Sequence, residues 1–418
     1  MVPFFCFDDR LLHGRHASGP RTQFLLECLQ DLASSVPLVI LRGRPEEEIP
    51  KLARRRGADE LHFTADVSPF ARRRRLSDLD CVGHPGLNVV DDVRSIETQG
   101  GKPYTVYSPF LRTWKELPRR EVIGKPGMSG EADEIPALAD LGLEQEVSDP
   151  RPGGEKAGRK RMHDWIRDGV DEYDRRHDQL AADRTSRLSS YLHFGCVSPR
   201  ELESLLPADG EGSIAFRRQL CWRDFYHHVL YHFPGNARSE FQERYRGSIR
   251  WSYAEEAFER WTQGQTGFPL VDAGMRQLGR EGWMHNRARL VVGSFLTKDL
   301  GIDWRWGERW FMRLLIDGDE ANNNGNWQWI ASVGVDPQPA YRRIYNPARH
   351  MERFDADGDY VRRHVPELRE VPDRYLAEPW EMPREVQEEA GCVIGSDYPK
   401  PMVDHKAARQ EALERYRL

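Results

Sequence analysis

The chain has 418 residues, with 61 Lys and Arg against 67 Asp and Glu, so its formal net charge is −6. Hydrophobic residues make up 39% and charged residues 31%, a balance that is typical of a folded globular protein and excludes wholesale disorder. The longest apolar runs, such as Val36–Leu41, are far shorter than the ~20 residues that cross a bilayer, and no signal peptide precedes them. Because the six cysteines form no CxxC pair, we expect reduced thiols, no metal centre and a cytoplasmic protein.

Short apolar runs alternate with helical patterns over residues 1–116. The predicted helices are Arg21–Ser34, Glu46–Arg56 and Pro69–Leu79, and the predicted strands are Pro3–Phe7, Pro37–Leu41, Glu60–Thr64 and Leu87–Val90. Alternation of strand and helix is typical of a doubly wound parallel sheet. We therefore predict an α/β domain at residues 1–116.

A segment rich in Pro, Gly, Glu and Lys follows, and we predict a linker at residues 117–160. Beyond it the periodicity is helical, without strand alternation. The predicted helices are Arg161–Asp174, Pro199–Leu206, Ala215–Tyr231, Tyr253–Gln263, Pro269–Glu281, Asn286–Leu300 and Trp306–Leu315. The sequence thus predicts an all-helical domain at residues 161–418.

The twelve tryptophans are unevenly distributed, because nine of them lie between residues 211 and 350. The same stretch has slightly more Lys and Arg than Asp and Glu, although the whole chain is acidic. Aromatic side chains interleaved with arginine are typical of nucleic-acid binding. The alternatives are that the arginines solvate helix faces and that the indoles pack the core.

Two segments carry dense polar side chains. Thr185–Ser189 places hydroxyl groups just before a predicted helix, which favours a bound phosphate, although such residues also serve as simple caps. Ile316–Trp329 holds two carboxylates, three consecutive Asn and two Trp, which suit the polar edge of a heteroaromatic ligand. A calcium loop fits poorly, since Gly and Glu do not fall at the positions it requires. We expect Arg289 to neutralise one of the two carboxylates.

Seven segments, in this order, resemble the DNA photolyase and cryptochrome family. They are Thr185–Ser189, Ala215–Tyr226, Gly267–Asp272, Gly282–Arg289, Phe295–Trp304, Leu315–Trp329 and Tyr345–Pro347. The resemblance spans nearly all of residues 173–368 and is strongest to class I photolyases, which act on cyclobutane pyrimidine dimers. It implies an α/β antenna-type domain joined to a helical domain that binds FAD.

The resemblance also implies the residues of the FAD site. The phosphate and adenine side would be bound by Tyr173, Thr185, Ser186, Arg187, Leu188 and Ser189. The flavin ring would be lined by Arg289, Asp317, Gly318, Asp319 and Asn323, with Asn323 near the flavin nitrogen whose protonation the protein must govern. A second chromophore of folate or deazaflavin type is left open.

Three tryptophans match the family's electron relay in their spacing. By this resemblance Trp251, Trp304 and Trp327 would pass electrons from the surface to the photoexcited oxidised flavin. Indole suits the task because it is, with the phenol of tyrosine, the side chain most easily oxidised by one electron. Packing of the core by large aromatics is the alternative for the other tryptophans, such as Trp261, Trp306 and Trp310.

The implied substrate is double-stranded DNA that contains pyrimidine dimers. Reduced FAD would absorb light and donate an electron to the dimer, the dimer would split, and the electron would return. The implied lesion and DNA contacts are Gln219, Trp222, Arg223, Asn286, Arg287 and Trp329. The family expectation is a monomer, and the alternative function is a cryptochrome-like blue-light photoreceptor with weak or no repair activity.

The chain departs from the family pattern in three places. Gln219 stands where many dimer photolyases have Glu, so it supplies neither a carboxylate nor a proton there, and Leu290 replaces a Met. Met284–Asn286 lacks the adjacent histidines of enzymes that act on the 6-4 photoproduct, which favours the cyclobutane dimer. The first strand-helix unit, ~30 residues, is missing, so we expect the true start to lie upstream.

Overall fold

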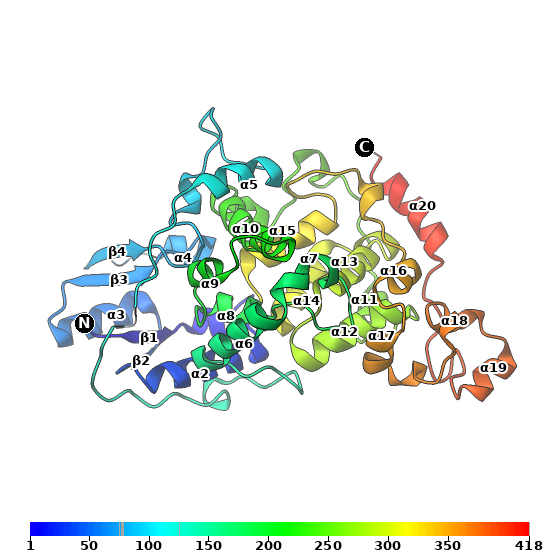
Figure 1. Cartoon of the computed structure of the whole chain (residues 1–418), viewed down its shortest axis with the longest axis horizontal. Helices are drawn as coiled ribbons and strands as arrows, with labels where there is room; N and C mark the ends of the chain where they lie inside the picture. Colours follow the sequence, from blue (N-terminus) through cyan, green and yellow to red (C-terminus); the bar gives the residue numbers. More distant parts are fainter. Residues whose placement is uncertain (75, 77–78, 125, 418) are drawn as a thin grey trace.

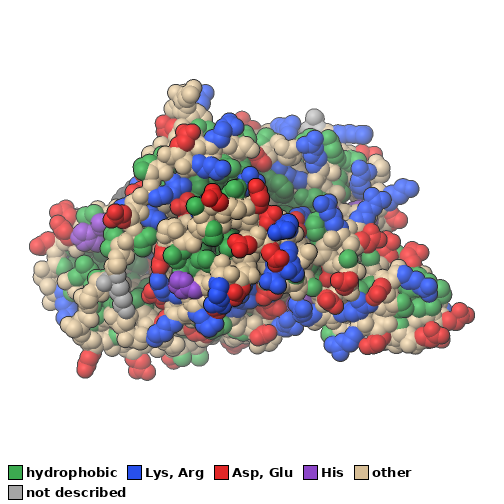
Figure 2. Space-filling model, viewed as in Figure 1, with side chains coloured by type: hydrophobic (Ala, Val, Ile, Leu, Met, Phe, Trp, Pro, Cys, Tyr) green, Lys and Arg blue, Asp and Glu red, His purple; other side chains and the backbone are tan. Residues whose placement is uncertain are grey.

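The computed structural model describes residues 1–74, 76, 79–124 and 126–417. Figure 1 shows the strands together at one end of the molecule and helices over the rest. On the face seen in Figure 2, basic and acidic side chains are interspersed, as the near balance of charges suggests. In the part of the chain that the structure describes, no helix is long and apolar enough to span a membrane.

The strands form two parallel pairs. Strand β1 (Phe4–Phe7) pairs with β2 (Val39–Arg42), and β3 (Glu60–Thr64) pairs with β4 (Asp80–His84). Parallel neighbours require a crossover, which α2 (Gly19–Ala33) provides for the first pair. The predicted α/β part with parallel strands and the predicted helix-rich remainder are thus present. Within the described residues the strands are two separate pairs, not one continuous sheet.

Two predicted elements near the second pair are wrong in position. The strand expected at Leu87–Val90 lies instead at β4, and residues 87–90 form bends because Asp224 accepts hydrogen bonds from the N–H groups of Val89 and Val90. The helix expected at Pro69–Leu79 is α4 (Pro69–Arg73) only. Residues 75, 77 and 78 of that prediction lie outside the described residues.

The remaining helices cover the region from residue 107 onward. Those that build the site are α5 (Tyr107–Glu116), α6 (Glu155–Asp168), α7 (Tyr173–Arg176), α8 (Ser189–His193), α10 (Glu211–His232), α13 (Asn286–Ser294), α14 (Trp304–Leu314) and α15 (Glu320–Ile330). Around them lie α9 (Pro199–Leu205), α11 (Glu255–Thr262), α12 (Pro269–Glu281), α16 (Pro347–Phe354), α17 (Asp359–His364), α18 (Asp373–Leu376), α19 (Arg384–Glu389) and α20 (His405–Arg415). Helix α3 (Pro45–Arg56) instead packs against the first strand pair.

Two helix predictions differ markedly from the structure in their bounds. Helix α6 begins at Glu155, inside the predicted linker, and stops at Gly169 instead of continuing to residue 174. The helix predicted at Asn286–Leu300 is α13 followed by a π-helical turn at Phe295–Asp299. Such turns are often placed at functional sites. Here the turn lies beside α14, which carries Trp304.

A buried carboxylate fastens the segment before α5 to α10. Asp224 is fully buried and accepts hydrogen bonds from Asn88 Nδ2 at 2.8 Å, from Trp114 Nε1 at 2.9 Å and from the N–H of Val89 at 3.1 Å. Buried carboxylates are tolerated when such donors surround them. This contact keeps α5 against α10, where the site is built.

Replacing Asp224 with Ala is therefore expected to destabilise the fold by about 3–5 kcal/mol, because it leaves several buried donors without an acceptor. Denaturant unfolding followed by circular dichroism measures the change. The matched control is Asp209→Ala, since Asp209 is exposed on the loop before α10. Equal stability of the Asp224 variant and the control would contradict this account.

Candidate functional site

A cavity of about 500 Å³ lies among α8, α10, α13 and α15. It brings together residues that are more than 150 positions apart in the sequence. Of the predicted site residues it is lined by Tyr173, Thr185, Ser186, Arg187, Leu188, Ser189, Gln219, Trp222, Arg223, Asn286, Arg287, Arg289, Asp317, Gly318, Asp319, Asn323, Trp327 and Trp329. Trp251 and Trp304 are not among the lining residues.

An ion pair lies at the wall of the cavity. Arg289 Nη2 contacts Asp317 Oδ2 at 2.8 Å, and the side chain of Asp317 is only 4% exposed. Ser189 Oγ donates to the same carboxylate at 2.6 Å. The prediction that Arg289 neutralises one of the two carboxylates is confirmed. The pair joins α13, the turn before α15 and α8, so it holds three walls of the cavity together.

The backbone of the loop at Thr185–Ser189 is fixed by hydrogen bonds from Arg161. Arg161 donates at 2.8 Å to the carbonyls of Thr185 and Ser186, which fixes the loop backbone. Arg187 has a φ of 51°, an uncommon conformation for a side-chain-bearing residue. The hydroxyl of Thr185 is buried and lacks a hydrogen-bond partner among the described residues. A buried polar atom without a partner at a cavity wall indicates a ligand that supplies one.

Asn323 and Asp319 both belong to the start of α15. Asn323 Nδ2 donates to the backbone carbonyl of Glu308 at 3.0 Å and to its carboxyl at 3.4 Å, so Glu308 on α14 orients the amide. Burial raises the pKa of the Glu308 carboxyl. Asp319 caps α15 by accepting from Asn322 N at 2.7 Å and also contacts His227 Nε2 at 3.3 Å.

Each of the two predicted lesion-flanking indoles has one face covered by the protein. The ring of Trp222 stacks on Tyr107 with centroids 3.6 Å apart and an interplanar angle of 5°. The guanidinium of Arg343 lies 3.8 Å from the ring centroid of Trp329. Both indoles also line the cavity, so part of each ring is available to a ligand there, and Trp222 additionally packs on Tyr226 with centroids 5.6 Å apart.

The four remaining predicted DNA contacts differ in whether the protein itself already engages their side chains. Gln219 and Asn286 are exposed and mark where the cavity opens. Arg287 is ion-paired with Asp178 and lies over Phe354. The terminal nitrogens of Arg223 donate to the carbonyls of Leu87 and Leu192, so this side chain is engaged in holding the fold.

The three predicted relay tryptophans differ in burial and in their relation to the cavity. Trp327 lines the cavity and is 3% exposed, Trp304 is fully buried, and Trp251 is half-buried. Gly307, one turn after Trp304 on α14, lies so close to Trp327 that a Cβ atom there would come within 2.2 Å of its ring. Trp251 lies near the start of α14, since its neighbour Ser252 forms a β-bridge with Ile302.

Sequence reasoning missed four residues that shape these contacts: Tyr107, Glu240, Glu308 and Arg343. Glu308 lies four residues after Trp304, inside a predicted helix, but gives no signal in the sequence that distinguishes it from a solvated carboxylate. Tyr107 and Arg343 lie outside every polar motif, and only the tertiary structure brings them against the two indoles that line the cavity.

The residues present fit FAD. The cavity offers an unpartnered hydroxyl at Thr185, a cation at Arg289 and amide and carboxylate groups at Asn323 and Asp319, which together can contact a phosphate and a polar ring edge. In the part of the chain that the structure describes, no cluster of His, Cys, Asp and Glu could hold a metal ion.

Known proteins agree with this assignment. The family model described as the FAD binding domain of DNA photolyase matches residues 216–418, and the model described as DNA photolyase matches residues 1–127. A deoxyribodipyrimidine photo-lyase of Streptomyces griseus is 40% identical over 427 residues, which cover 98% of this chain and 91% of the relative. That of Escherichia coli is 38% identical over 372 residues, covering 85% and 77%.

Two solved structures are similar over almost the whole chain. A class III photolyase from Agrobacterium tumefaciens has a TM-score of 0.88 at 32% identity and covers 99% of this chain and 91% of its own. A cryptochrome from Synechocystis has a TM-score of 0.88 at 28% identity, covering 99% and 92%. The fold and the cavity thus define a flavoprotein with an FAD-binding helical domain. The chain belongs to the DNA photolyase family.

Proposed function

We propose that this protein is a deoxyribodipyrimidine photo-lyase, which uses light to split cyclobutane pyrimidine dimers in double-stranded DNA. The observation that carries the proposal is the pair of indoles, Trp222 and Trp329, on the wall of the FAD cavity. Each has one face packed against the protein and lines the cavity, where a flat ligand can contact it. Stacking between aromatic side chains is how proteins hold a base that has left the duplex.

When bound and reduced, FAD supplies light absorption and an electron for the dimer. The ion pair of Arg289 with Asp317 gives the cavity wall fixed charges that need no reorganisation during the reaction. Glu308 holds the amide of Asn323 in one orientation beside the expected flavin position. The covered faces of the two indoles keep these rings in place, so a dimer between them would be held close to the electron donor.

The DNA itself would be bound by phosphate contacts around the cavity opening. Asn286 and Gln219 are exposed there, and Gln219 can both donate to and accept from a pyrimidine edge. A damaged, poorly stacked pair costs less to flip than an intact one. We propose that the protein acts as a monomer, since one chain supplies every residue of the site.

The decisive experiment uses the FAD-loaded protein, chemically reduced, with a duplex oligonucleotide that holds a single thymine dimer. Dimer loss under blue light, followed by chromatography, is the expected result. A dark sample is the control. Unchanged dimers together with intact reduced flavin would refute the repair proposal.

Replacing Trp329 with Ala is expected to weaken binding to dimer-containing DNA by about tenfold, because stacking on one aromatic ring contributes ~1–3 kcal/mol per base. Affinity for undamaged DNA of the same sequence should be unchanged, since phosphate contacts dominate it. Fluorescence anisotropy with both duplexes at one salt concentration measures the difference. An equal loss for both duplexes would contradict the role of this indole.

A cryptochrome-like photoreceptor is the second candidate, favoured by the similarity to the Synechocystis cryptochrome and by Gln219. The repair experiment separates the two, because a photoreceptor would photoreduce its flavin without removing dimers. The variant Gln219→Glu adds a finer comparison. Faster repair by this variant than by the parent protein would show that the Gln limits repair without abolishing it.

We also propose that the two strand pairs belong to one doubly wound α/β domain at residues 1–116. The parallel order within each pair and the crossover helix α2 support it. Since α6 begins at Glu155, we place the start of the helical domain there, before the predicted residue 161. Limited proteolysis tests the boundary, with cleavage expected between residues 117 and 154.

A further inference from the structure

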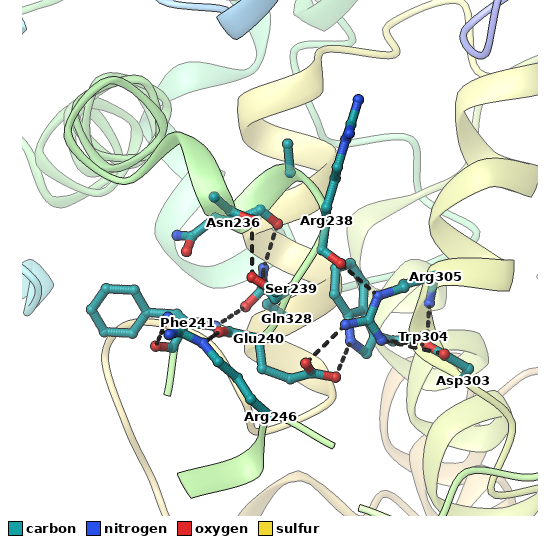
Figure 3. A network of polar contacts seen from close by, with 12 residues as sticks. Asn236, Arg238, Ser239, Glu240, Phe241, Arg246, Asp303, Trp304, Arg305 and Gln328 are labelled. Atoms are coloured by element: carbon teal, nitrogen blue, oxygen red, sulfur yellow. Dashed lines mark hydrogen bonds and ion pairs between the residues drawn. The ribbon is translucent and has the colours of Figure 1, made fainter. Parts of the chain in front are cut away.

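A buried carboxylate contacts the middle tryptophan of the predicted relay. The indole Nε1 of Trp304 donates to Glu240 Oε1 at 3.4 Å, and Trp304 is fully buried while Glu240 is 4% exposed. Figure 3 shows Glu240 reaching from the loop after α10 to Trp304 and to Arg305 on α14. A charge in so dry a place acts strongly on its neighbours.

The charges around Trp304 do not cancel. Arg305, whose guanidinium lies 4.7 Å from the centroid of the Trp304 ring, pairs with Glu240 at 2.8 Å and with Asp303 at 3.1 Å, so one cation faces two carboxylates and the group keeps a net negative charge. Burial acts to raise the pKa of Glu240, but the hydrogen bond and charge of Arg305 outweigh it and leave the pKa below its ordinary value. The carboxylate is therefore ionised at neutral pH.

Trp329 lies in an environment of different net charge from that of Trp304. Arg343, which is 1% exposed, lies over Trp329 and donates to the backbone carbonyls of Trp329 and Asp336. Among the described residues no carboxylate forms an ion pair with Arg343, so a buried positive charge faces this ring. An indole beside a cation is harder to oxidise, and an indole beside an anion is easier to oxidise.

We propose that Glu240 is a positioning residue of the relay: its negative charge stabilises the oxidised form of Trp304 and draws the electron vacancy outward, while Arg343 keeps the vacancy off Trp329. The inference rests on the proposed function, since it needs the relay. It goes further by naming the groups that select one of the two indoles, Trp327 and Trp329, that line the same cavity.

In the proposed relay, each tryptophan that loses an electron regains one from the next tryptophan. Trp327 loses one electron to photoexcited oxidised FAD, which is the oxidant. Trp304 then gives one electron to Trp327, so Trp327 is restored and Trp304 is oxidised, with its proton held on Nε1 in the bond to Glu240. Trp251 restores Trp304 in the same way, and a small thiol added to the solution finally reduces Trp251.

The test compares Glu240→Gln with the parent holoprotein by transient absorption after a flash. Gln keeps an oxygen that can accept from Trp304 but removes the charge, so electron transfer from Trp304 to Trp327 should slow at least about fivefold. The matched control is Glu243→Gln, since Glu243 is exposed on the same loop. Its rate should equal that of the parent, and an unchanged rate in Glu240→Gln would overturn the proposal.

A second readout needs no light. In the dark holoprotein with ¹⁵N-labelled indoles, the Nε1–H resonance of Trp304 should move upfield in Glu240→Gln, while those of Trp327 and Trp251 stay in place. Absence of that shift would refute the contact itself. A general loss of structure would move all three resonances, and this pattern would count against a specific role for Glu240.

Two further outcomes keep the proposal falsifiable. If Glu240→Gln does not fold, Arg305→Gln carries the test, because it leaves both carboxylates uncompensated and should speed transfer from Trp304 by about twofold or more. A slower rate there would overturn the proposal. Parent protein that forms no oxidised tryptophan would refute the relay, whereas a working relay insensitive to these variants would refute only the role of Glu240.

Discussion

Replacing Trp327 with Phe is expected to slow photoreduction of the bound oxidised flavin by about a hundredfold, yet to leave dimer repair by chemically reduced protein unchanged. Trp327 is the one predicted relay indole that lines the cavity, so we expect it to be the first donor of the predicted relay. Phe keeps an aromatic ring between α14 and α15 but is much harder to oxidise. The absorbance of oxidised flavin under blue light, with a thiol reductant, measures the rate.

The matched control for this variant is Trp310→Phe. Trp310 lies on the same helix as Trp304 but packs against Phe258, away from the cavity. Its photoreduction should match that of the parent. If prereduced Trp327→Phe protein failed to repair dimers while remaining folded, the indole would serve the substrate, and the relay assignment would be wrong.

Replacing Asp317 with Asn is expected to weaken FAD binding by at least about tenfold, or ~1.4 kcal/mol. The change removes the charge that compensates Arg289 and one acceptor of the Ser189 hydroxyl. Breaking a fully buried pair costs more, but Arg289 is 25% exposed and water compensates part of its charge. Titration of apoprotein with FAD, followed by flavin fluorescence, gives the two dissociation constants.

The control for Asp317→Asn is Glu201→Gln. Glu201 is also in an ion pair, with Arg159, but it lies on α9 outside the cavity. FAD affinity should be unaffected by this variant. Equal FAD affinity of Asp317→Asn and the parent would show that the pair contributes to the fold without contributing to the cofactor site.

Local patterns predicted most of the elements. Strand β3 has the predicted bounds, and α12 was predicted at both ends because Pro269 can begin a helix and Gly282 can end one in a left-handed conformation. The strand predicted at Leu87–Val90 was wrong because its apolar residues are buried against helices without pairing to another strand. Their N–H groups bind Asp224, which is more than 130 residues away, and no local pattern indicates such a partner.

The candidate site, like the fold, could be predicted from the sequence only in part. The residues with distinctive chemistry, such as the carboxylates and amides of Ile316–Trp329, stand in contiguous segments and could be predicted. The residues that orient them could not, because Tyr107, Arg343 and Glu240 are ordinary in their local sequence. Their importance comes from a stacking distance of 3.6 Å, a buried cation over a ring and a carboxylate beside an indole.

By itself the sequence determined the class of fold, the family and the cluster of tryptophans and polar residues that a flavin and DNA would need, because periodicity and motif spacing are local properties of the chain. Only the tertiary structure decided which charged groups lie beside each of those tryptophans. Among the described residues, packing places both Glu240 and Arg305 beside Trp304, and it places Arg343, which has no ion-pair partner there, over Trp329. Charge in a dry interior decides how readily each indole loses an electron.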